Sequence, residues 1–554
     1  MQWGVKIPMR DGVHLSAILY RPAKASGPVP AICTRTPYIA QNYHEQGMYF
    51  AKHGFVFLVV DVRGRGNSDG TFHPLNEAPD GHDTVEWLAR QPYCNGQVAM
   101  WGLSYLGYSQ WAAASQCPKH LATIVPAASA CFGVDIPIRN NVFSRYMIRW
   151  LTAVSGRTLQ DRIFADQAYW HAKFRETFET GLPLNQLDRE VGNPSPLFQE
   201  WLEHPHPDEY WDRYNPTPAQ YAKLAIPILT ITGSYDDDQP GALAHYRTYM
   251  QSASPEQRAK HFLIIGPWDH PGTQKPKAEF GGFKVGPASL VDLSQLHLQW
   301  YAYTMQGGPR PEFLQKNVAY YVTGSEDWRY ADTLDAITAR HRPLYLQSTC
   351  NPTDVYSSGT LGEMPQENGE PDRYTYDPRD NEFAELESTL EPDRLVNSPL
   401  VNATRHQLIY HSDVFAESVD VCGFFRLSLW LGIDQPDADF RATVYEVDVA
   451  GRVLQLSSDW LRARYRSSSR EPHLIETEEP LRYDFERFTF TARRIAAGSR
   501  LRLVVGALAS IHWEKNHHSG GRTAQESFSD ARSVNVRLFH SAERPSVLHV
   551  PIGS

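Results

Sequence analysis

The sequence predicts a multidomain α/β protein in which a parallel sheet is interrupted by a helical insertion and followed by an all-β domain. Short apolar runs typical of buried parallel strands alternate with helical patterns up to about residue 130, and recur near residues 230 and 265. Residues 131–216 lack that strand pattern and are rich in aromatic side chains. From about residue 315, short alternating segments separated by Gly, Pro, Asn and Asp replace the long helical patterns.

The first part of the chain supplies half of the sheet. Residues 13–20 alternate as a strand of an N-terminal hairpin, and residues 30–34 and 55–61 are short apolar runs of buried strands. Residues 80–90 place apolar side chains at helical spacing and acids in the first turn. The order of strand and helix predicts a doubly wound sheet, which the strands near residues 230 and 265 complete.

The remaining segments predict a cap and a jelly roll. An insertion at 131–216 separates the two halves of the sheet, so we expect it to cover the site. In the last part, Phe425, Leu427, Leu429 and Leu431 alternate with other residues, as on one face of a strand. Five segments there read as strands: 317–322, 342–347, 407–411, 422–431 and 501–505. The predicted boundaries are 1–130 and 217–312 for the α/β domain, 131–216 for the cap and 313–554 for the jelly roll.

Composition restricts the classes of function. The chain has 554 residues, too many for one hydrophobic core, and 53 basic against 63 acidic side chains give a formal charge of −10. The acidic balance argues against nucleic acid as a partner, and no apolar run is long enough to cross a membrane. The N-terminus lacks the pattern of a secretory signal, so we expect a cytoplasmic protein.

Cysteine and histidine usage predicts neither disulfides nor a metal. The six cysteines include no closely spaced pair, which favours free thiols and argues against a zinc motif. Histidine is plentiful, at 22 residues, but the adjacent His517 and His518 lack spaced partners and read as a polar loop. We therefore expect no metal and no cofactor.

Ser104 is the strongest candidate for a catalytic side chain. It follows the apolar run Met100-Trp101-Gly102-Leu103 and precedes a predicted helix, with glycines at 102 and 107. A serine on a sharp strand-to-helix turn has an exposed hydroxyl beside a helix N-terminus, as acyl transfer requires. The spacing departs from the general Gly-x-Ser-x-Gly, because the second glycine falls one residue later. Alone, the pattern is equally compatible with an ordinary turn serine.

An acid and a histidine follow in the expected order. Asp236 comes after the predicted strand 224–233, and His270 comes after the predicted strand 261–269. The order serine, acid, histidine is that of the α/β-hydrolase fold, and each residue lies beyond the carboxyl end of a strand. The two aspartates after Asp236 are alternatives for the acid, or could cap the next helix. The sequence therefore predicts the triad Ser104, Asp236 and His270.

Four motifs together carry a family resemblance: Asp61-Val62-Arg63-Gly64-Arg65-Gly66-Asn67-Ser68-Asp69-Gly70, Gly102-Leu103-Ser104-Tyr105-Leu106-Gly107, Gly233-Ser234-Tyr235-Asp236 and Gly266-Pro267-Trp268-Asp269-His270. With them the chain resembles the cocaine esterase-like (CocE/NonD) serine hydrolases, which are related to Xaa-Pro dipeptidyl-peptidases and α-amino acid ester hydrolases. The glycine spacing around Ser104 is the one that this family shows, and the family pattern selects Asp236 as the acid.

The resemblance also implies the roles of further residues. Tyr38, after Pro37, would donate its phenolic hydrogen to the oxyanion, and the backbone N–H of Tyr105 would be the second donor. In the cap, Trp150 and Trp170 stand where relatives place aromatic residues of the acyl pocket. Four other residues have a mainly structural interpretation: Arg63 and Arg65, in a loop beside the site, and Asp208 and Glu209, which resemble the acids that bind a substrate α-amino group but read as surface charges.

These observations predict a serine hydrolase that cleaves a small-molecule ester or amide through an acyl-enzyme. An Xaa-Pro dipeptidyl-peptidase or an α-amino acid ester hydrolase is the first alternative, although the larger peptidases carry an extra N-terminal domain. An acyltransferase of a biosynthetic pathway would use the same acyl-enzyme. A carbohydrate-binding protein with a vestigial triad is the alternative from another class. A jelly roll packed against a hydrolase also leaves surface for a homodimer.

Overall fold

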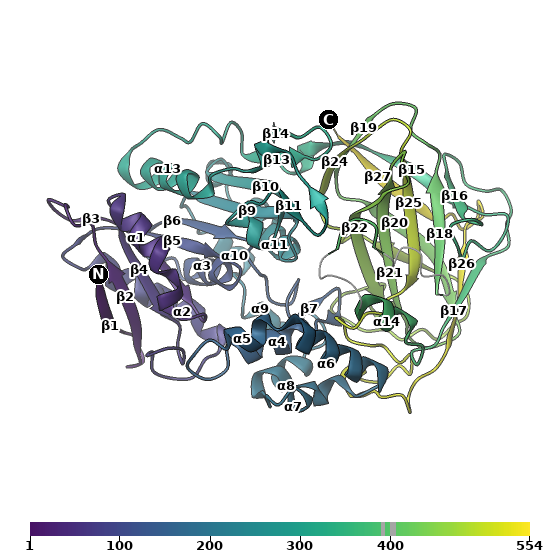
Figure 1. Ribbon diagram of the computed structural model, residues 1–554, viewed down its shortest axis with the longest axis horizontal. Coiled ribbons are helices and arrows are strands. Elements are labelled where there is room, and N and C mark those ends of the chain that lie inside the picture. The colour runs from purple at the N-terminus through teal and green to yellow at the C-terminus, as the bar shows by residue number, and fades with distance from the viewer. Residues whose placement is uncertain (389–393, 399–405, 554) are drawn as a thin grey trace.

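The computed structural model describes residues 1–388, 394–398 and 406–553. An N-terminal α/β body and a C-terminal β body lie side by side, and a group of helices from the middle of the chain packs beneath both (Figure 1). No helix in these described ranges is long and apolar enough to cross a membrane.

The N-terminal body contains a mostly parallel sheet. Its order among the described residues is β1-β2-β4-β3-β5-β6-β9-β10-β13-β14, and the strands from β4 to β13 run parallel. Most residues of these central strands are buried on both faces, which explains their nearly continuous apolar runs. The strands are β1 (Gln2–Pro8), β2 (His14–Tyr20), β3 (Val29–Thr36), β4 (Val56–Asp61), β5 (Cys94–Leu103), β6 (Leu121–Ala127), β9 (Ile228–Tyr235), β10 (His261–Asp269), β13 (Val318–Val322) and β14 (Asp327–Ala331).

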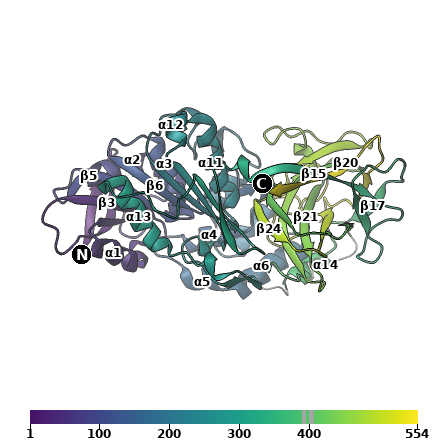
Figure 2. The same ribbon diagram turned by 90° about the horizontal axis from the view of Figure 1, so that it is seen from above.

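Helices cover both faces of this sheet, as the view in Figure 2 shows. One apolar cluster joins the sheet to α2 (Glu77–Ala89), α3 (Tyr105–Ser115), α10 (Pro218–Tyr221) and α11 (Gln239–Ser252). A second cluster joins the opposite face to α1 (His44–Lys52) and α13 (Leu293–Gln306). The predicted α/β-hydrolase fold is confirmed, and its carboxyl edge is where β5, β9 and β10 end together.

The predicted insertion is mainly helical. Its aromatic side chains form one apolar cluster that also includes Tyr105 and Tyr108 of α3 and Ile511 of the β body. A short hairpin of β7 (Ile138–Arg139) and β8 (Val142–Phe143) precedes the helices. The helices are α4 (Tyr146–Ala153), α5 (Asp161–Ala165), α6 (Gln167–Glu179), α7 (Leu187–Glu190), α8 (Pro196–Leu202) and α9 (Glu209–Asp212).

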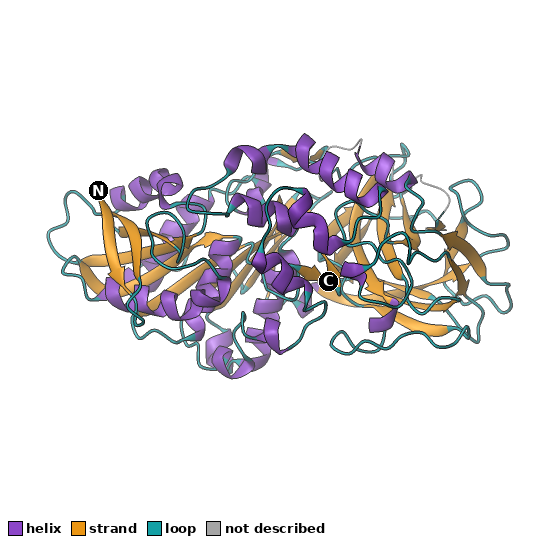
Figure 3. Ribbon diagram, turned by 90° about the horizontal axis from the view of Figure 1, so that it is seen from below, coloured by secondary structure: helices purple, strands orange, loops and turns teal. Residues whose placement is uncertain are grey.

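The C-terminal body is built almost entirely from strands (Figure 3). Thirteen strands of the described residues form its jelly-roll sheets around one apolar core, to which Leu427, Leu429 and Leu431 contribute as the alternation predicted. The elements are β15 (Thr338–Gln347), β16 (Gly359–Gly362), β17 (Asp372–Tyr376), α14 (Glu382–Ser388), β18 (Gln407–Ser412), β19 (Val419–Gly423), β20 (Arg426–Ile433), β21 (Asp439–Val447), β22 (Val453–Arg462), β23 (Leu481–Phe485), β24 (Thr491–Ile495), β25 (Arg500–Ala507), β26 (Val534–Phe539) and β27 (Val547–Gly553).

One predicted strand belongs to the other sheet. Residues 317–322 were expected in the jelly roll, but β13 pairs in parallel with β10 of the catalytic sheet, and β14 follows it as the edge. All five residues of β13 are buried, as in a central parallel strand, and Val318, Tyr320 and Val322 share an apolar cluster with α11 and with Phe490 of the β body. The first strand of the jelly roll is therefore β15, and the predicted boundary at residue 313 falls before the end of the α/β sheet.

Candidate active site

Ser104 lies on the sharp turn between β5 and α3, with backbone φ 63° and ψ −127°. A non-glycine residue held at such a positive φ costs of order 1–3 kcal/mol, so the surroundings must impose it. The Ser104 N–H donates to the carbonyl of Ala127, and the Ser104 carbonyl accepts from the N–H groups of Gly107 and Tyr108. The turn presents the serine at the carboxyl edge of the sheet, where it lines a pocket.

The two glycines beside Ser104 make this turn possible. A Cβ on Gly102 would lie 2.4 Å from the Cβ of Leu106, and Gly102 itself has φ 144°. A Cβ on Gly107 would lie 2.7 Å from the carbonyl oxygen of Ala127 on β6. Gly102 therefore leaves room for the turn, and Gly107 lets α3 pack closely on the sheet.

Asp236 and His270 meet at the ends of two adjacent parallel strands, β9 and β10. Nδ1 of His270 lies 2.8 Å from Oδ1 of Asp236, whose side chain is fully buried. The other carboxylate oxygen of Asp236 accepts from the hydroxyl of Thr232 at 2.8 Å, and Oδ1 also accepts from the backbone N–H of Asp238. These bonds fix the ring of His270 so that Nε2 is left for a reacting partner in the pocket that it shares with Ser104.

Asp238 is a second acid at the site, which the sequence offered only as an alternative triad acid or as a helix cap. It occupies the N-cap position of α11 without a side-chain capping bond, and its Oδ2 lies 3.8 Å from Nδ1 of His270. Burial, outweighing the charge of His270, raises the pKa of Asp238 to about 7, and the carboxyl group lies near Ser104. Burial by itself lowers the pKa of His270, but the charges of Asp238, Asp236 and Asp237 raise it to about 10.

Tyr38 lies above Ser104 as a neutral hydrogen-bond donor. Its hydroxyl oxygen accepts from the indole N–H of Trp150 at 2.9 Å, and the hydroxyl lies near Ser104. Burial raises the pKa of Tyr38 to about 12, so the phenol keeps its proton. The backbone N–H of Tyr38 donates to Thr36, and the buried Arg65 donates to the carbonyl of Pro37. The loop that carries Tyr38 is thus held on both sides.

The backbone N–H of Tyr105 is the other predicted oxyanion donor. Tyr105 is the first residue of α3, so its N–H belongs to the first turn, where backbone donors have no acceptor inside the helix. Its phenol donates to Glu77 at 3.0 Å, and its ring stacks on Trp150 with centroids 5.6 Å apart. The side chain is therefore fixed while the amide stays at the turn beside Ser104.

All the predicted site residues except Asp236 line one pocket of about 520 Å³. The acid lies just behind it, bonded to His270. Trp150 and Trp170 both reach the wall, and the indole N–H of Trp170 donates to the carbonyl of Ile163. Asp237 and Asp238, considered from the sequence as alternative acids or helix caps, also line the wall. Sequence reasoning missed further charged wall residues from the cap and the jelly roll: Asp135, Arg139, Arg149, Glu387, Arg394 and Arg441.

The two acids of the cap, Asp208 and Glu209, lie away from the pocket. Asp208 caps α9 through the N–H groups of Tyr210 and Trp211 and pairs with His204 at 2.6 Å, and neither it nor Glu209 lines the pocket. This agrees with their interpretation as structural or surface charges, because short-range capping accounts for Asp208.

The structural interpretation of Arg63 and Arg65 agrees with their contacts. Arg63 pairs with Asp11 and Asp80. Arg65 is fully buried and donates to backbone carbonyls. Asp269, which precedes His270, accepts from the N–H of Gly272.

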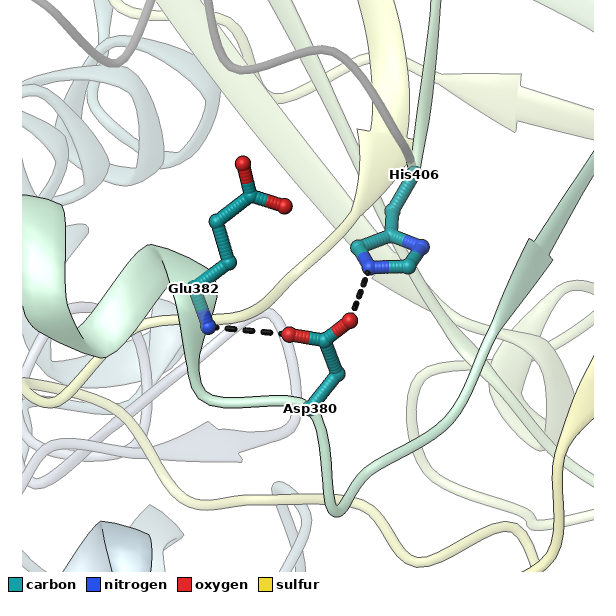
Figure 4. A group of neighbouring side chains, drawn as sticks. All are labelled: Asp380, Glu382 and His406. Atoms are coloured by element: carbon teal, nitrogen blue, oxygen red, sulfur yellow. Dashed lines mark hydrogen bonds and ion pairs between the residues drawn. The ribbon is translucent and has the colours of Figure 1, made fainter.

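One group of side chains could hold a metal ion, although the sequence predicted none. Ligand atoms of Asp380, Glu382 and His406 lie within 4.8 Å of one another (Figure 4). Asp380 accepts from the backbone N–H of Glu382 and lies 2.9 Å from Nε2 of His406, whose Nδ1 faces the carbonyl of Thr375. These bonds fasten the start of α14, from which Phe383 and Glu387 reach the pocket. The contacts give the group a structural role.

Family models match two long segments of the chain. Residues 11–272 match the family model of the X-Pro dipeptidyl-peptidases (S15 family), and residues 312–549 match that of the X-Pro dipeptidyl-peptidase C-terminal non-catalytic domain. A cocaine esterase from a Rhodococcus species is 26% identical, over 99% of this chain and 98% of its own length.

Solved structures share the whole architecture. An α-amino acid ester hydrolase superposes with a TM-score of 0.85 at 20% identity, covering 99% of this chain and 96% of the other. An aminopeptidase from a marine sediment archaeon of the Thaumarchaeota gives 0.83 at 20% identity, with the same coverage of both chains. These two likenesses support the fold alone. The family models and the full-length sequence match place the chain among the cocaine esterase-like serine hydrolases, enzymes that act on esters or amides.

Proposed function

We propose that Ser104, Asp236 and His270 are the catalytic triad of this hydrolase, and that its substrate is a small-molecule ester or amide. The observation that carries the proposal is the 2.8 Å contact of His270 with the buried Asp236, in a pocket shared with a serine held at positive φ. The three residues follow three separate strands, β5, β9 and β10, which end at the same edge of the sheet.

The mechanism follows from the geometry. His270 takes the proton of Ser104 as the serine oxygen bonds to the carbonyl carbon, and Asp236 stabilises the imidazolium. The Tyr38 hydroxyl and the Tyr105 N–H hold the oxyanion. When the intermediate collapses, the bond to the leaving group breaks and His270 returns its proton to that group. Water then attacks the acyl-enzyme by the same steps and releases the acid and free Ser104.

A fluorophosphonate probe tests this assignment directly. We expect stoichiometric labelling of the folded protein, because the probe phosphonylates a serine activated by a neighbouring base. Peptide mass spectrometry should place the label on Ser104. Prior treatment with an ester substrate should slow labelling. Labelling of another serine, or none on the folded chain, would overturn the triad and bring the carbohydrate-binding alternative forward.

A second candidate is an enzyme for α-aminoacyl esters or amides, including N-terminal dipeptides. Asp238 lies next to Ser104, and Oδ2 of Asp135 is buried without a hydrogen-bond partner among the described residues. Burial raises the pKa of Asp135 well above its ordinary range, and the charge of Asp238 adds to this. A substrate ammonium group would donate to the unpartnered oxygen of Asp135 and would favour the ionised form of its carboxyl group. Faster turnover of alanine 4-nitroanilide than of its N-acetyl derivative would favour this candidate.

The position of Asp238 beside His270 leads us to expect a change in the pH dependence of kcat/KM when Asp238 is replaced. The charge of ionised Asp238 favours protonated His270, so the base becomes free only at higher pH. Asp238→Asn removes that charge, and the acid limb of kcat/KM should move to lower pH by about one unit with an uncharged ester. Asp269→Asn, whose carboxylate faces the Gly272 N–H, is the control and should leave the limb in place. A limb that stays or moves upward in Asp238→Asn contradicts the proposed coupling.

Several expectations remain proposals of the same kind. Acyl transfer to an amine or alcohol would use the same acyl-enzyme with another acceptor in place of water. We also retain as predictions the homodimer, the cytoplasmic location, and the absence of nucleic acid as a partner and of a metal or other cofactor.

A further inference from the structure

The jelly roll contributes a wall of the active-site pocket. On β21, Phe440, Ala442 and Val444 enter the core of the β body, while the alternate side chains of Arg441, Thr443 and Tyr445 line the pocket. The same outward face continues on β22 and β25, which pair with β21 and supply further lining residues: Gln455, Ser458, Trp460, Val504 and Gly506. A regular strand pattern therefore builds a surface that meets the substrate.

Two arginines come together on this face. Arg441 is the direct cross-strand neighbour of Trp460, so the two side chains share one face of the sheet. Arg139, from the β7 hairpin at the start of the cap, lies over the Trp460 ring with its guanidinium carbon 4.4 Å from the centroid. The indole N–H of Trp460 in turn donates to the carbonyl of Arg139. The Trp460 ring thus positions the guanidinium group of Arg139 near the side chain of Arg441.

Both guanidinium groups keep donors for a ligand. Nη2 of Arg139 and Nε of Arg441 are buried and have no hydrogen-bond partner within the described ranges. Burial lowers the pKa of Arg139, and the like charge of Arg441 acts in the same direction. A buried N–H group without an acceptor is unfavourable, and an anion bound between the two like charges would satisfy both groups.

The nearest acids do not supply that anion. Asp459 has the largest attractive influence on Arg139, but its carboxylate accepts from Asn140 and from the N–H groups of Trp460 and Arg487. Asp135 and Asp237 also attract Arg139, yet no ion pair within 4.0 Å joins either arginine to an acid among the described residues. The arginines therefore face the cavity with incomplete compensation.

We propose that Arg139 and Arg441 form a carboxylate-binding subsite, and that the substrate carries an acidic group in addition to the ester or amide that Ser104 attacks. The planar guanidinium forks suit a carboxylate, which can accept from both. The inference rests on the proposed function, because the subsite and Ser104 line the same pocket. It adds the chemical class of the substrate, an acidic ester or amide.

Paired substrates test the subsite and locate the acidic group. In the acyl pair, mono-(4-nitrophenyl) adipate is compared with 4-nitrophenyl hexanoate. In the leaving-group pair, the hexanoyl ester of 4-hydroxybenzoate is compared with that of methyl 4-hydroxybenzoate. The wild type should prefer the carboxylated member of one pair by kcat/KM. Arg441→Gln and Arg139→Gln should each lower kcat/KM for the preferred carboxylated substrate about ten- to hundredfold. The kcat/KM for its uncharged counterpart should change little. Arg441→Lys should retain part of the preference.

The controls separate a binding effect from a folding effect. Arg426→Gln removes an exposed arginine of the jelly roll that lines a different pocket, and it should leave both members of each pair unchanged. Thermal unfolding of every variant identifies any that misfold, and Arg441→Gln alone suffices if Arg139→Gln is unstable. Equal losses on both members, or no preference in the wild type, would overturn the subsite. If no ester is turned over and no probe labels Ser104, the proposed function itself is wrong, and the subsite proposal falls with it.

Discussion

Ser104→Ala should abolish turnover of every ester and amide that the wild type cleaves, with a fall in kcat of about 10⁴- to 10⁶-fold. The variant keeps the oxyanion donors and the pocket but has no oxygen with which to form the acyl-enzyme. Steady-state assays on one 4-nitrophenyl ester, with fluorophosphonate labelling of the same preparation, measure both consequences. Formation of an acyl-enzyme by the variant would exclude Ser104 as the nucleophile.

Stability measurements on the same position provide the control. Alanine at 104 has a Cβ and must adopt the same φ of 63°, so Ser104→Ala should unfold at nearly the wild-type temperature. Glycine adopts that backbone readily, so Ser104→Gly should be more stable than Ser104→Ala by about 1 kcal/mol in chemical denaturation. A glycine variant no more stable than the alanine variant would show that the turn is not strained.

Tyr38→Phe should lower kcat about 10²- to 10³-fold and leave KM nearly unchanged. The phenol donates to an oxygen that becomes negative only in the transition state, so its loss affects the chemical step more than ground-state binding. Trp150 already donates to the Tyr38 oxygen, which directs the phenolic proton elsewhere. Pre-steady-state kinetics of acylation with a chromogenic ester would measure the effect.

Trp150→Phe is the matched comparison for Tyr38. It keeps an aromatic ring against Tyr105 but removes the N–H that positions the phenol, so we expect a smaller loss of kcat, of about tenfold. A Tyr38→Phe variant with nearly wild-type kcat would leave the Tyr105 amide as the principal oxyanion donor, and would contradict the assignment of Tyr38.

The sequence could predict the residues whose roles depend on local order. Ser104, Asp236 and His270 each follow an apolar run that forms a strand, and parallel strands end at one edge, so their convergence follows from topology. Gly102 and Gly107 could likewise be interpreted from the sequence, because the absence of a side chain within one turn of Ser104 indicates a close local contact.

The charged lining could not be predicted in this way. Arg139 and Arg441 are separated by about three hundred positions and meet only because the hairpin of the cap packs on β22 of the jelly roll. No spacing rule connects such residues. Asp238 carried a weak signal, as part of three consecutive aspartates, but capping was an equally good interpretation. The position of β13 was missed because a strand buried on both sides looks alike in either sheet.

The wall that the jelly roll gives to the pocket separates two properties of this enzyme. In the proposed mechanism, reactivity depends on the turn after β5 and the ends of β9 and β10, whereas the outward faces of β21, β22 and β25 line the pocket without supporting that turn. Substitutions on those faces can alter substrate choice while the nucleophile keeps its geometry. Libraries for a new selectivity are therefore best built at alternate positions of these strands, where each outward side chain varies against an unchanged core.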